Sequence, residues 1–160
     1  MKFETNSFFV AKGIRSSFLI LVTLIAAITI FSQSNEKSVS QTDMAAIRSS
    51  PAYSEILLRK TEIQADLEAI IADYTDENPK VIDLRFELNA LNKSLEKVNS
   101  VKPLETGKLT LALGKLIVKK ASLETELSRL LRSYGRDHPE VKRAARRVEI
   151  FDSAIREILR

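Results

Sequence analysis

The sequence predicts an all-α protein: an N-terminal apolar helix, followed by two repeated antiparallel αα-hairpins that form a coiled-coil-like helical bundle. Glycine and proline are scarce, with four of each, while Leu, Ile, Ala, Glu, Lys and Arg dominate. Apolar residues also recur at alternating spacings of three and four. This composition and this spacing are typical of long amphipathic helices. The absence of cysteine excludes disulfides, thiolate metal sites and a thiol nucleophile.

Residues 1–33 resemble a membrane anchor or a signal peptide. Lys2, Lys12 and Arg15 precede an uncharged apolar run of 14 residues, 18–31. The run fits a signal peptide, and with its polar flanks it reaches the marginal length of about 18 for a bilayer span. Residues 32–34 (Ser-Gln-Ser) offer a small-x-small cleavage site. We favour a single-pass anchor with a cytoplasmic N-terminus, because the basic residues precede the run. Cleavage, or a buried core helix, is the alternative.

A polar linker is expected over residues 34–50, and a helical coiled-coil domain over residues 51–160. Within this domain the segments 56–98 and 116–158 are predicted to be repeats. A shift of 60 residues places Tyr74–Val81 on Tyr134–Val141. Ten apolar positions coincide: Ile63/Leu123, Leu67/Leu127, Ile70/Leu130, Tyr74/Tyr134, Val81/Val141, Leu84/Ala144, Leu88/Val148, Leu91/Phe151, Leu95/Ile155 and Val98/Ile158.

One unbroken apolar seam marks the third predicted helix. It consists of Leu109, Leu113, Leu116, Lys120, Leu123, Leu127, Leu130 and Tyr134. Such a stripe requires burial against a partner helix. Lys60 and Lys120 hold the same seam position in the two copies. In one interpretation, which we favour, each lysine side chain extends from a loosely packed end of the helices into water. In the other, the lysine fixes the register of the helices.

The prolines and the residues before them predict where helices begin. Proline suits the first turn of a helix, so Pro79 and Pro139 should open helices that Asn78 and His138 cap. Helices are therefore expected near 52–74, 78–99, 107–134 and 138–159, with the main loop over 99–107. The polar stretches after Tyr74 and Tyr134 are long enough to reverse the chain, although a kinked continuous helix is the alternative. The two hairpins should then form a four-helix bundle or pair with another chain.

The two Tyr-x4-Pro-x-Val stretches resemble the periplasmic coiled-coil arm of the polysaccharide chain-length determinant (polysaccharide co-polymerase) family of bacterial inner-membrane proteins. Tyr134, His138, Pro139 and Val141 match the pattern of that arm fully, whereas the first stretch has Asn78 in place of histidine. Residues 1–160 contain neither the α/β membrane-proximal domain nor the second membrane helix of that family, nor a Gly-rich phosphate loop. The resemblance thus implies an envelope coiled coil near polysaccharide export, and not chain-length control.

No residue pattern predicts catalysis, a cofactor or a metal. His138 is the single histidine, and its copy, Asn78, cannot shuttle protons, so capping is the role that the two share. The carboxylates lie on predicted solvent faces or in turns, without the facing pair that acid–base chemistry requires. They are Glu62, Asp66, Glu68, Asp73, Asp76 and Glu77.

A basic stripe is the one charge feature that suggests a ligand. Lys142, Arg143, Arg146 and Arg147 share one side of the fourth predicted helix, where they would meet phosphate, anionic polysaccharide or lipid head groups. The simpler interpretation, which we favour, is a solvated face partly neutralised by the acidic first hairpin. Nucleic acid is not an expected partner, since no recognition motif accompanies the stripe.

The sequence therefore predicts a non-enzymatic, membrane-tethered coiled-coil scaffold or assembly protein of the bacterial cell envelope. It would cross the inner membrane once, with its helical domain in the periplasm. Its helical faces would bind a second copy or another envelope protein. The alternative is a soluble periplasmic helical module, secreted after cleavage, that binds an anionic polymer or a client protein.

Overall fold

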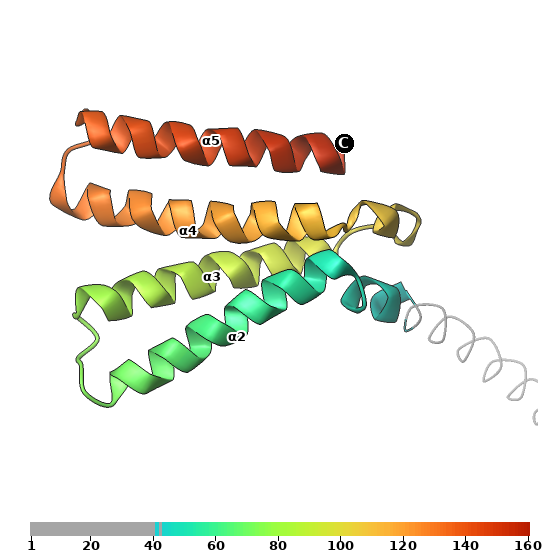
Figure 1. Cartoon of the computed structure of the whole chain (residues 1–160), viewed down its shortest axis with the longest axis horizontal. Coiled ribbons are helices and arrows are strands. Elements are labelled where there is room, and N and C mark those ends of the chain that lie inside the picture. Colours follow the sequence, from blue (N-terminus) through green and yellow to red (C-terminus); the bar gives the residue numbers. More distant parts are fainter. Residues whose placement is uncertain (1–40, 42) are drawn as a thin grey trace, which may run out of the picture. The chain divides into compact units, whose positions relative to one another are not determined.

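A computed structural model describes residue 41 and residues 43–160 of the chain, and these residues form helices joined by short connections (Figure 1). No strand occurs among them, so the all-α class is confirmed for this part of the chain. The predicted anchor or signal peptide and most of the predicted linker lie outside the described residues. The elements are α2 (Pro51–Ile71), α3 (Pro79–Asn99), a 3-10 helix η1 (Pro103–Lys108), α4 (Leu111–Ser133) and α5 (Pro139–Leu159).

Each of the four prolines stands at the start of a helix, and three of them follow a residue whose side chain caps that helix. Proline has no N–H to lose there, and its fixed φ suits the first turn. Helix α4 is the exception, because Thr110 caps it without a proline, and its Oγ1 accepts a hydrogen bond from Leu113 N. α4 therefore starts at Leu111 and not at the predicted residue 107, which belongs to η1.

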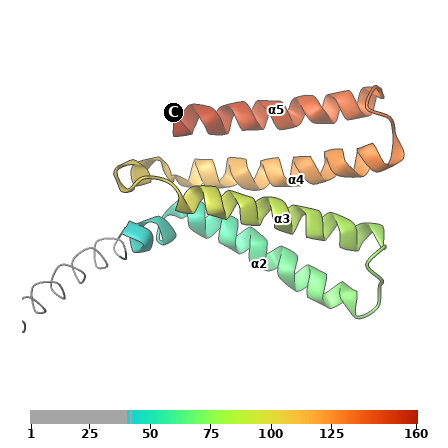
Figure 2. The same ribbon diagram turned by 180° about the vertical axis from the view of Figure 1, so that it is seen from behind.

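Three helices pack against one another, and the fourth lies outside them. α2, α3 and α4 are in mutual contact, whereas α5 packs mainly on α4 (Figures 1 and 2). The chain reverses between α2 and α3 and again between α4 and α5. Of these four helices, α5 is the least enclosed, since it has one main neighbour where α4 has three.

The central position of α4 explains why it buries more than its predicted seam. Of the seam, Leu109, Leu113 and Leu123 are buried, while Leu127 and Leu130 are half-buried. Tyr134, at the end of the seam, is exposed. A second buried row, towards the rest of the core, consists of Gly114, Ile117, Ala121 and Thr125. This row was not predicted from the sequence, because its small and polar residues do not form an apolar stripe.

α2 and α4 approach each other closely at Gly114. A Cβ atom built on this residue would lie 2.8 Å from Glu55 Cβ and 2.9 Å from Ala52 Cα. Beside it, Ala52 N donates a hydrogen bond of 3.2 Å to Leu109 O, which ties the start of α2 to the start of α4. Glycine thus lets two helix backbones approach to a distance that any side chain would prevent.

The last part of the predicted linker is not an extended linker in the structure. Residues 43–48 are helical, and Ile47 is buried within the same core cluster as Ala52 and Ile56. The apolar residues beside it, Met44, Ala45 and Ala46, are consecutive and give no spacing of three and four, so sequence pattern could not identify Ile47 as a core residue.

Candidate functional site

The two predicted turns have matching backbone geometry. The cap residues Asn78 and His138 have φ of −60° in both cases and ψ of 128° and 136°. Asn78 Oδ1 accepts a hydrogen bond from Lys80 N at 2.9 Å, and His138 Nδ1 accepts one from Glu140 N at 3.3 Å. Pro79 and Pro139 occupy the first helical positions. The structure thus places the six predicted turn and cap residues at two helix-to-helix connections and not in a shared site.

The tyrosines before the turns are exposed, and within the described residues Tyr134 has an aromatic partner whereas Tyr74 has none. The ring of Tyr134 stacks on His138, with centroids 4.2 Å apart and planes 17° from parallel. Asn78 provides no ring for Tyr74. His138 therefore supports its turn in two ways, as a cap and as a stacking surface. The spacing of four residues was visible in the sequence, but the stack depends on how the turn orients the two rings.

Each of the four predicted anion-contacting cations pairs with a carboxylate of the protein. Lys142 lies 3.1 Å from Asp137, Arg146 lies 3.3 Å from Glu149, and Arg147 lies 3.0 Å from Glu126. Arg143 pairs with Glu140. All four pairs are largely exposed, where such pairs are weak and are open to exchange with other anions.

The source of this neutralisation differs from the prediction. The acidic first hairpin was the expected source, but the carboxylates come from α5, from the turn before it and from α4. The reason is the arrangement of the helices: α5 packs on α4, and α2 lies on the other side of α4.

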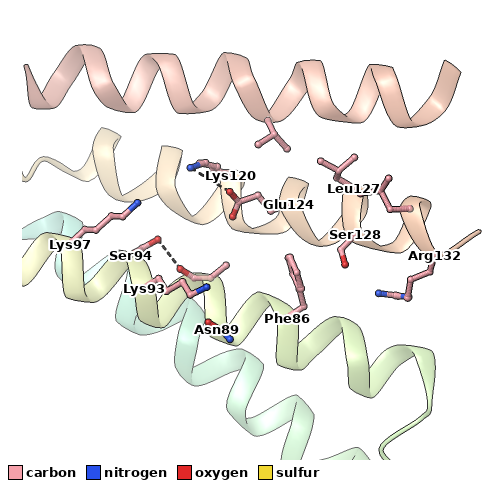
Figure 3. A pocket seen from close by; sticks show the side chains of 13 residues that line it. Phe86, Asn89, Lys93, Ser94, Lys97, Lys120, Glu124, Leu127, Ser128 and Arg132 are labelled. Atoms are coloured by element: carbon pink, nitrogen blue, oxygen red, sulfur yellow. Dashed lines mark hydrogen bonds and ion pairs between the residues drawn. The ribbon is translucent and has the colours of Figure 1, made fainter. Parts of the chain in front are cut away.

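A groove of about 650 Å³ runs along α3, α4 and α5 (Figure 3). It forms because α5 rests on α4 and leaves the neighbouring face of α3 uncovered. Phe86 projects from α3 towards α4, while Leu127 projects from α4 towards α5. The lining residues are Phe86, Asn89, Ala90, Lys93, Ser94 and Lys97 of α3, Lys120, Glu124, Leu127, Ser128, Leu131 and Arg132 of α4, and Val148 of α5.

The groove is predominantly basic. Four of its lining residues are cationic and one, Glu124, is anionic. Arg132 pairs with Asp83, and Lys120 pairs with Asp152 at 2.6 Å and Glu124 at 3.4 Å. Lys93 and Lys97 form no ion pair within residues 43–160. These two lysines place positive charge along the α3 side of the groove without a direct ion pair, although Lys97 is near enough to Asp152 to contribute to the lowered pKa of that carboxyl group.

Lys120 does not extend into water, the arrangement that we favoured for the seam lysine. Its side chain is 21% exposed, and its ammonium bridges from α4 to Asp152 on α5. Burial opposes the charged form, but the hydrogen bond to Asp152 and the two nearby carboxylates outweigh it, so the pKa of Lys120 is raised. The hydrogen bond from Lys120 lowers the pKa of Asp152. In the first copy the position of Asp152 holds Asn92, which has no charge.

One buried ion pair was not predicted from the sequence. Glu87 on α3 is buried, and its Oε1 accepts a hydrogen bond of 2.9 Å from Arg59 Nε on α2. Burial of the Arg59 guanidinium acts to lower its pKa. The hydrogen bonds to Glu87 and Glu62 outweigh this effect, so the pKa of Arg59 is raised. The only sequence signal was that Glu87 falls between apolar positions of α3. The pair joins two helices of the core, and its Arg59 side borders a surface hollow of about 410 Å³ between α2 and α4.

The described part of the chain contains neither a metal site nor a membrane-spanning helix. Among residues 41 and 43–160, no three His, Asp or Glu side chains gather as a metal site would require. None of the helices in that part of the chain has the length and apolar character needed to cross a bilayer.

Comparison with known proteins adds no relative. No protein-family model, no curated protein and no solved structure matches this chain. The resemblance to the polysaccharide co-polymerase arm thus stays a prediction that depends on the two Tyr-x4-Pro-x-Val stretches.

Proposed function

We propose that this chain is a non-enzymatic, membrane-tethered helical scaffold or assembly protein of the bacterial cell envelope. The observation that carries the proposal is the incomplete cover of the bundle: α5 has one main neighbour, and a groove runs beside it. Helical faces left uncovered in this way are typical of modules that bind another helix. The uncharged run 18–31 supplies the tether, and the basic residues before it direct the bundle across the membrane.

We infer further that the two hairpins are copies of one unit. Backbone hydrogen bonds at the turns match after the shift of 60 residues. The N–H groups of residues 74 and 134 donate to the carbonyls four residues earlier, at 3.0 and 2.8 Å, and those of Asn78 and His138 donate to the carbonyls three residues earlier, at 3.1 and 3.0 Å. Two aligned pairs also agree in burial: Ile63 and Leu123 are both buried, and so are Val81 and Val141. A duplicated hairpin supports assembly, since two related surfaces favour repeated contacts.

A place in the periplasm, near polysaccharide export, is the part of the proposal that depends on the family resemblance. The alternative function, a secreted module for anionic polymers, has less support. Its candidate cations on α5 already pair with carboxylates of the same chain, and a polymer would have to displace these.

The test is the fate of the full-length chain in bacterial cells. We expect it to stay with the membrane fraction after alkaline extraction, with an intact N-terminus by mass spectrometry. We also expect protease added to spheroplasts to digest the helical domain. The double substitution Leu21→Arg and Ile25→Arg should release it from the membrane, because each arginine at the centre of a span costs about 3 kcal/mol. Cleavage near Ser34 would instead support the secreted module, and a protected, cytoplasmic domain would overturn both functions.

A further inference from the structure

We propose that the groove receives α2 of a second copy of this chain. The inserting surface is the α2 outer face, which we define as Leu58, Ala65, Ala69 and Ala72 with the flanking carboxylates Glu62, Asp66, Glu68 and Asp73. The inference rests on the proposed scaffold function and names its partner. The resulting contact is heterologous, with α2 of one copy in the groove of the next.

The charge of the groove selects the kind of helix that fits. Apolar contact is offered by Phe86, Leu127 and Leu131, of which Phe86 and Leu131 are 40% and 43% exposed. Lys93 and Lys97 stand one helical turn apart on the α3 side, with no carboxylate paired to them in the described chain (Figure 3). An occupant must therefore combine an apolar or small-residue face with carboxylates at its edge.

The α2 outer face has this combination. Residues 61–79 contain six carboxylates and no lysine or arginine. All eight residues of the α2 outer face are exposed, and Leu58 is 59% exposed. Its three alanines let a second helix approach closely, and Glu68 lies on one side of them with Asp66 and Asp73 on the other. No ion pair involves Asp66, Glu68 or Asp73 within the described residues.

The lengths of the two surfaces agree. The α3 side of the groove extends from Phe86 to Lys97, about 17 Å at 1.5 Å per residue. The carboxylates of the α2 outer face extend from Glu62 to Asp73, which lies two residues after the helix ends at Ile71, about 17 Å on the same scale. The groove therefore accommodates about three turns of helix, which is the part of α2 that lacks basic residues.

A symmetric contact between two grooves does not fit the same charges. It would place Lys93 and Lys97 of both copies against one another, and like charges that face each other across an interface oppose association. A heterologous contact places each lysine pair against carboxylates. Such contacts continue from copy to copy, so the assembly grows as a ring or an open chain.

Charge reversal in the full-length, detergent-solubilised protein tests the proposal, with assembly followed by sedimentation. We expect the wild type to associate, and Lys93→Glu with Lys97→Glu to weaken association at least about tenfold. Asp66→Lys with Asp73→Lys should weaken it similarly. The matched control is Lys142→Glu with Arg146→Glu, which makes the same charge change at the same spacing on the exposed face of α5, away from both the groove and the α2 outer face, and should associate like the wild type.

Mixing the two weakened variants makes the test specific. One variant has carboxylates at positions 93 and 97 of the groove and keeps an acidic α2 outer face. The other keeps a basic groove and has lysines at positions 66 and 73, beside the remaining Glu62 and Glu68. Each should stay dissociated alone, and the mixture should recover association, because the reversed positions of the two variants carry opposite charges. A mixture that stays dissociated overturns the proposal, as does wild-type association by the Lys93/Lys97 variant.

Cross-linking gives an independent measurement, because the chain has no native cysteine. Ala69→Cys and Ser94→Cys, each in a separate chain, should form a disulfide-linked heterodimer on oxidation of the mixture. Predominant Ser94–Ser94 linkage would mean a symmetric contact, and a monomeric wild type would mean no self-assembly; both overturn the proposal. The scaffold function fails separately, in the membrane fractionation described above. A chain that is anchored but monomeric retains the tether and points to a foreign acidic helix as the occupant.

Discussion

Replacing Gly114 with alanine has two opposing effects on stability. In a helix interior alanine is more favourable than glycine by about 1 kcal/mol. At Gly114, however, a methyl group would overlap backbone atoms of Ala52, which cannot move without shifting α2. We therefore expect Gly114→Ala to lower the free energy of unfolding by about 1–3 kcal/mol, the usual cost of overpacking. Thermal and urea unfolding measure the change. The control is Gly135→Ala, since no atom lies within 4 Å of a Cβ there; equal effects of the two would contradict the close approach.

His138 combines a cap with a stacked ring, and two substitutions separate these contributions. His138→Asn keeps a strong capping side chain and removes the ring on which Tyr134 stacks. We expect it to cost up to about 1 kcal/mol, within the range of an aromatic pair. His138→Ala removes both and should cost about 1–2 kcal/mol. If His138→Asn instead abolishes biological function while its unfolding curve is unchanged, the histidine has a chemical role.

The ion pair between Lys120 and Asp152 predicts a dependence of stability on acid. The hydrogen bond from Lys120 lowers the folded pKa of Asp152 below its unfolded value of about 3.9. The pair therefore stabilises the fold above about pH 4, and this contribution is lost as the pH falls through the folded pKa. Asp152→Asn should lower the free energy of unfolding by about 1 kcal/mol at pH 7, and the deficit should shrink towards pH 2. A deficit of the same size at every pH would mean that shape, and not charge, is responsible.

At the scale of elements, α3 and α5 differ although their sequences align. Leu91, Leu95 and Val98 of α3 are buried, whereas the aligned Phe151, Ile155 and Ile158 of α5 are half-buried. The cause is the number of neighbours, since α3 packs against α2 and α4 but α5 packs mainly against α4.

This difference should appear in hydrogen exchange of the dissociated protein. Amide protection reflects the free energy of local opening, which is lowest where few apolar contacts must be broken. We expect the amides of α5 to exchange before those of α3 and α4, as measured by mass spectrometry of peptides from the Lys93→Glu, Lys97→Glu variant. Slower exchange in α5 than in α3 would mean that α5 is covered by contacts absent from the isolated chain.

At the scale of the whole molecule, the distribution of charge decides how copies meet. The net charge is small, but the carboxylates gather on α2 and its turn, while Lys93 and Lys97 stand beside the groove. Salt screens such an attraction, because the Debye length falls from about 10 Å at 0.1 M to about 3 Å at 1 M. Association of the full-length protein should therefore weaken steadily as salt is raised. Association that strengthens with salt would indicate an apolar interface instead.

The sequence was sufficient for the features that depend on neighbours along the chain. Proline at a first helical turn, Asn78 and His138 before it, and the seam of α4 each follow from local chemistry or helical period. Helix starts were predicted to within one residue except for α4, where the 3-10 turn η1 takes the first residues. The carboxylates of α2 and the cations of α5 were also recognised, although not the partners of those cations.

Only the tertiary structure decided which faces are covered. The buried row through Gly114, the ion pair between Arg59 and Glu87, and the groove beside α5 all join residues far apart in sequence. A helical period identifies an apolar stripe but not the helix that covers it, because antiparallel and crossed packings bury the same stripe. The sequence by itself thus determined the four long helices and every start among them except that of α4, and packing determined that α4 is central, that α5 is half-covered, and that a basic groove lies along α3, α4 and α5.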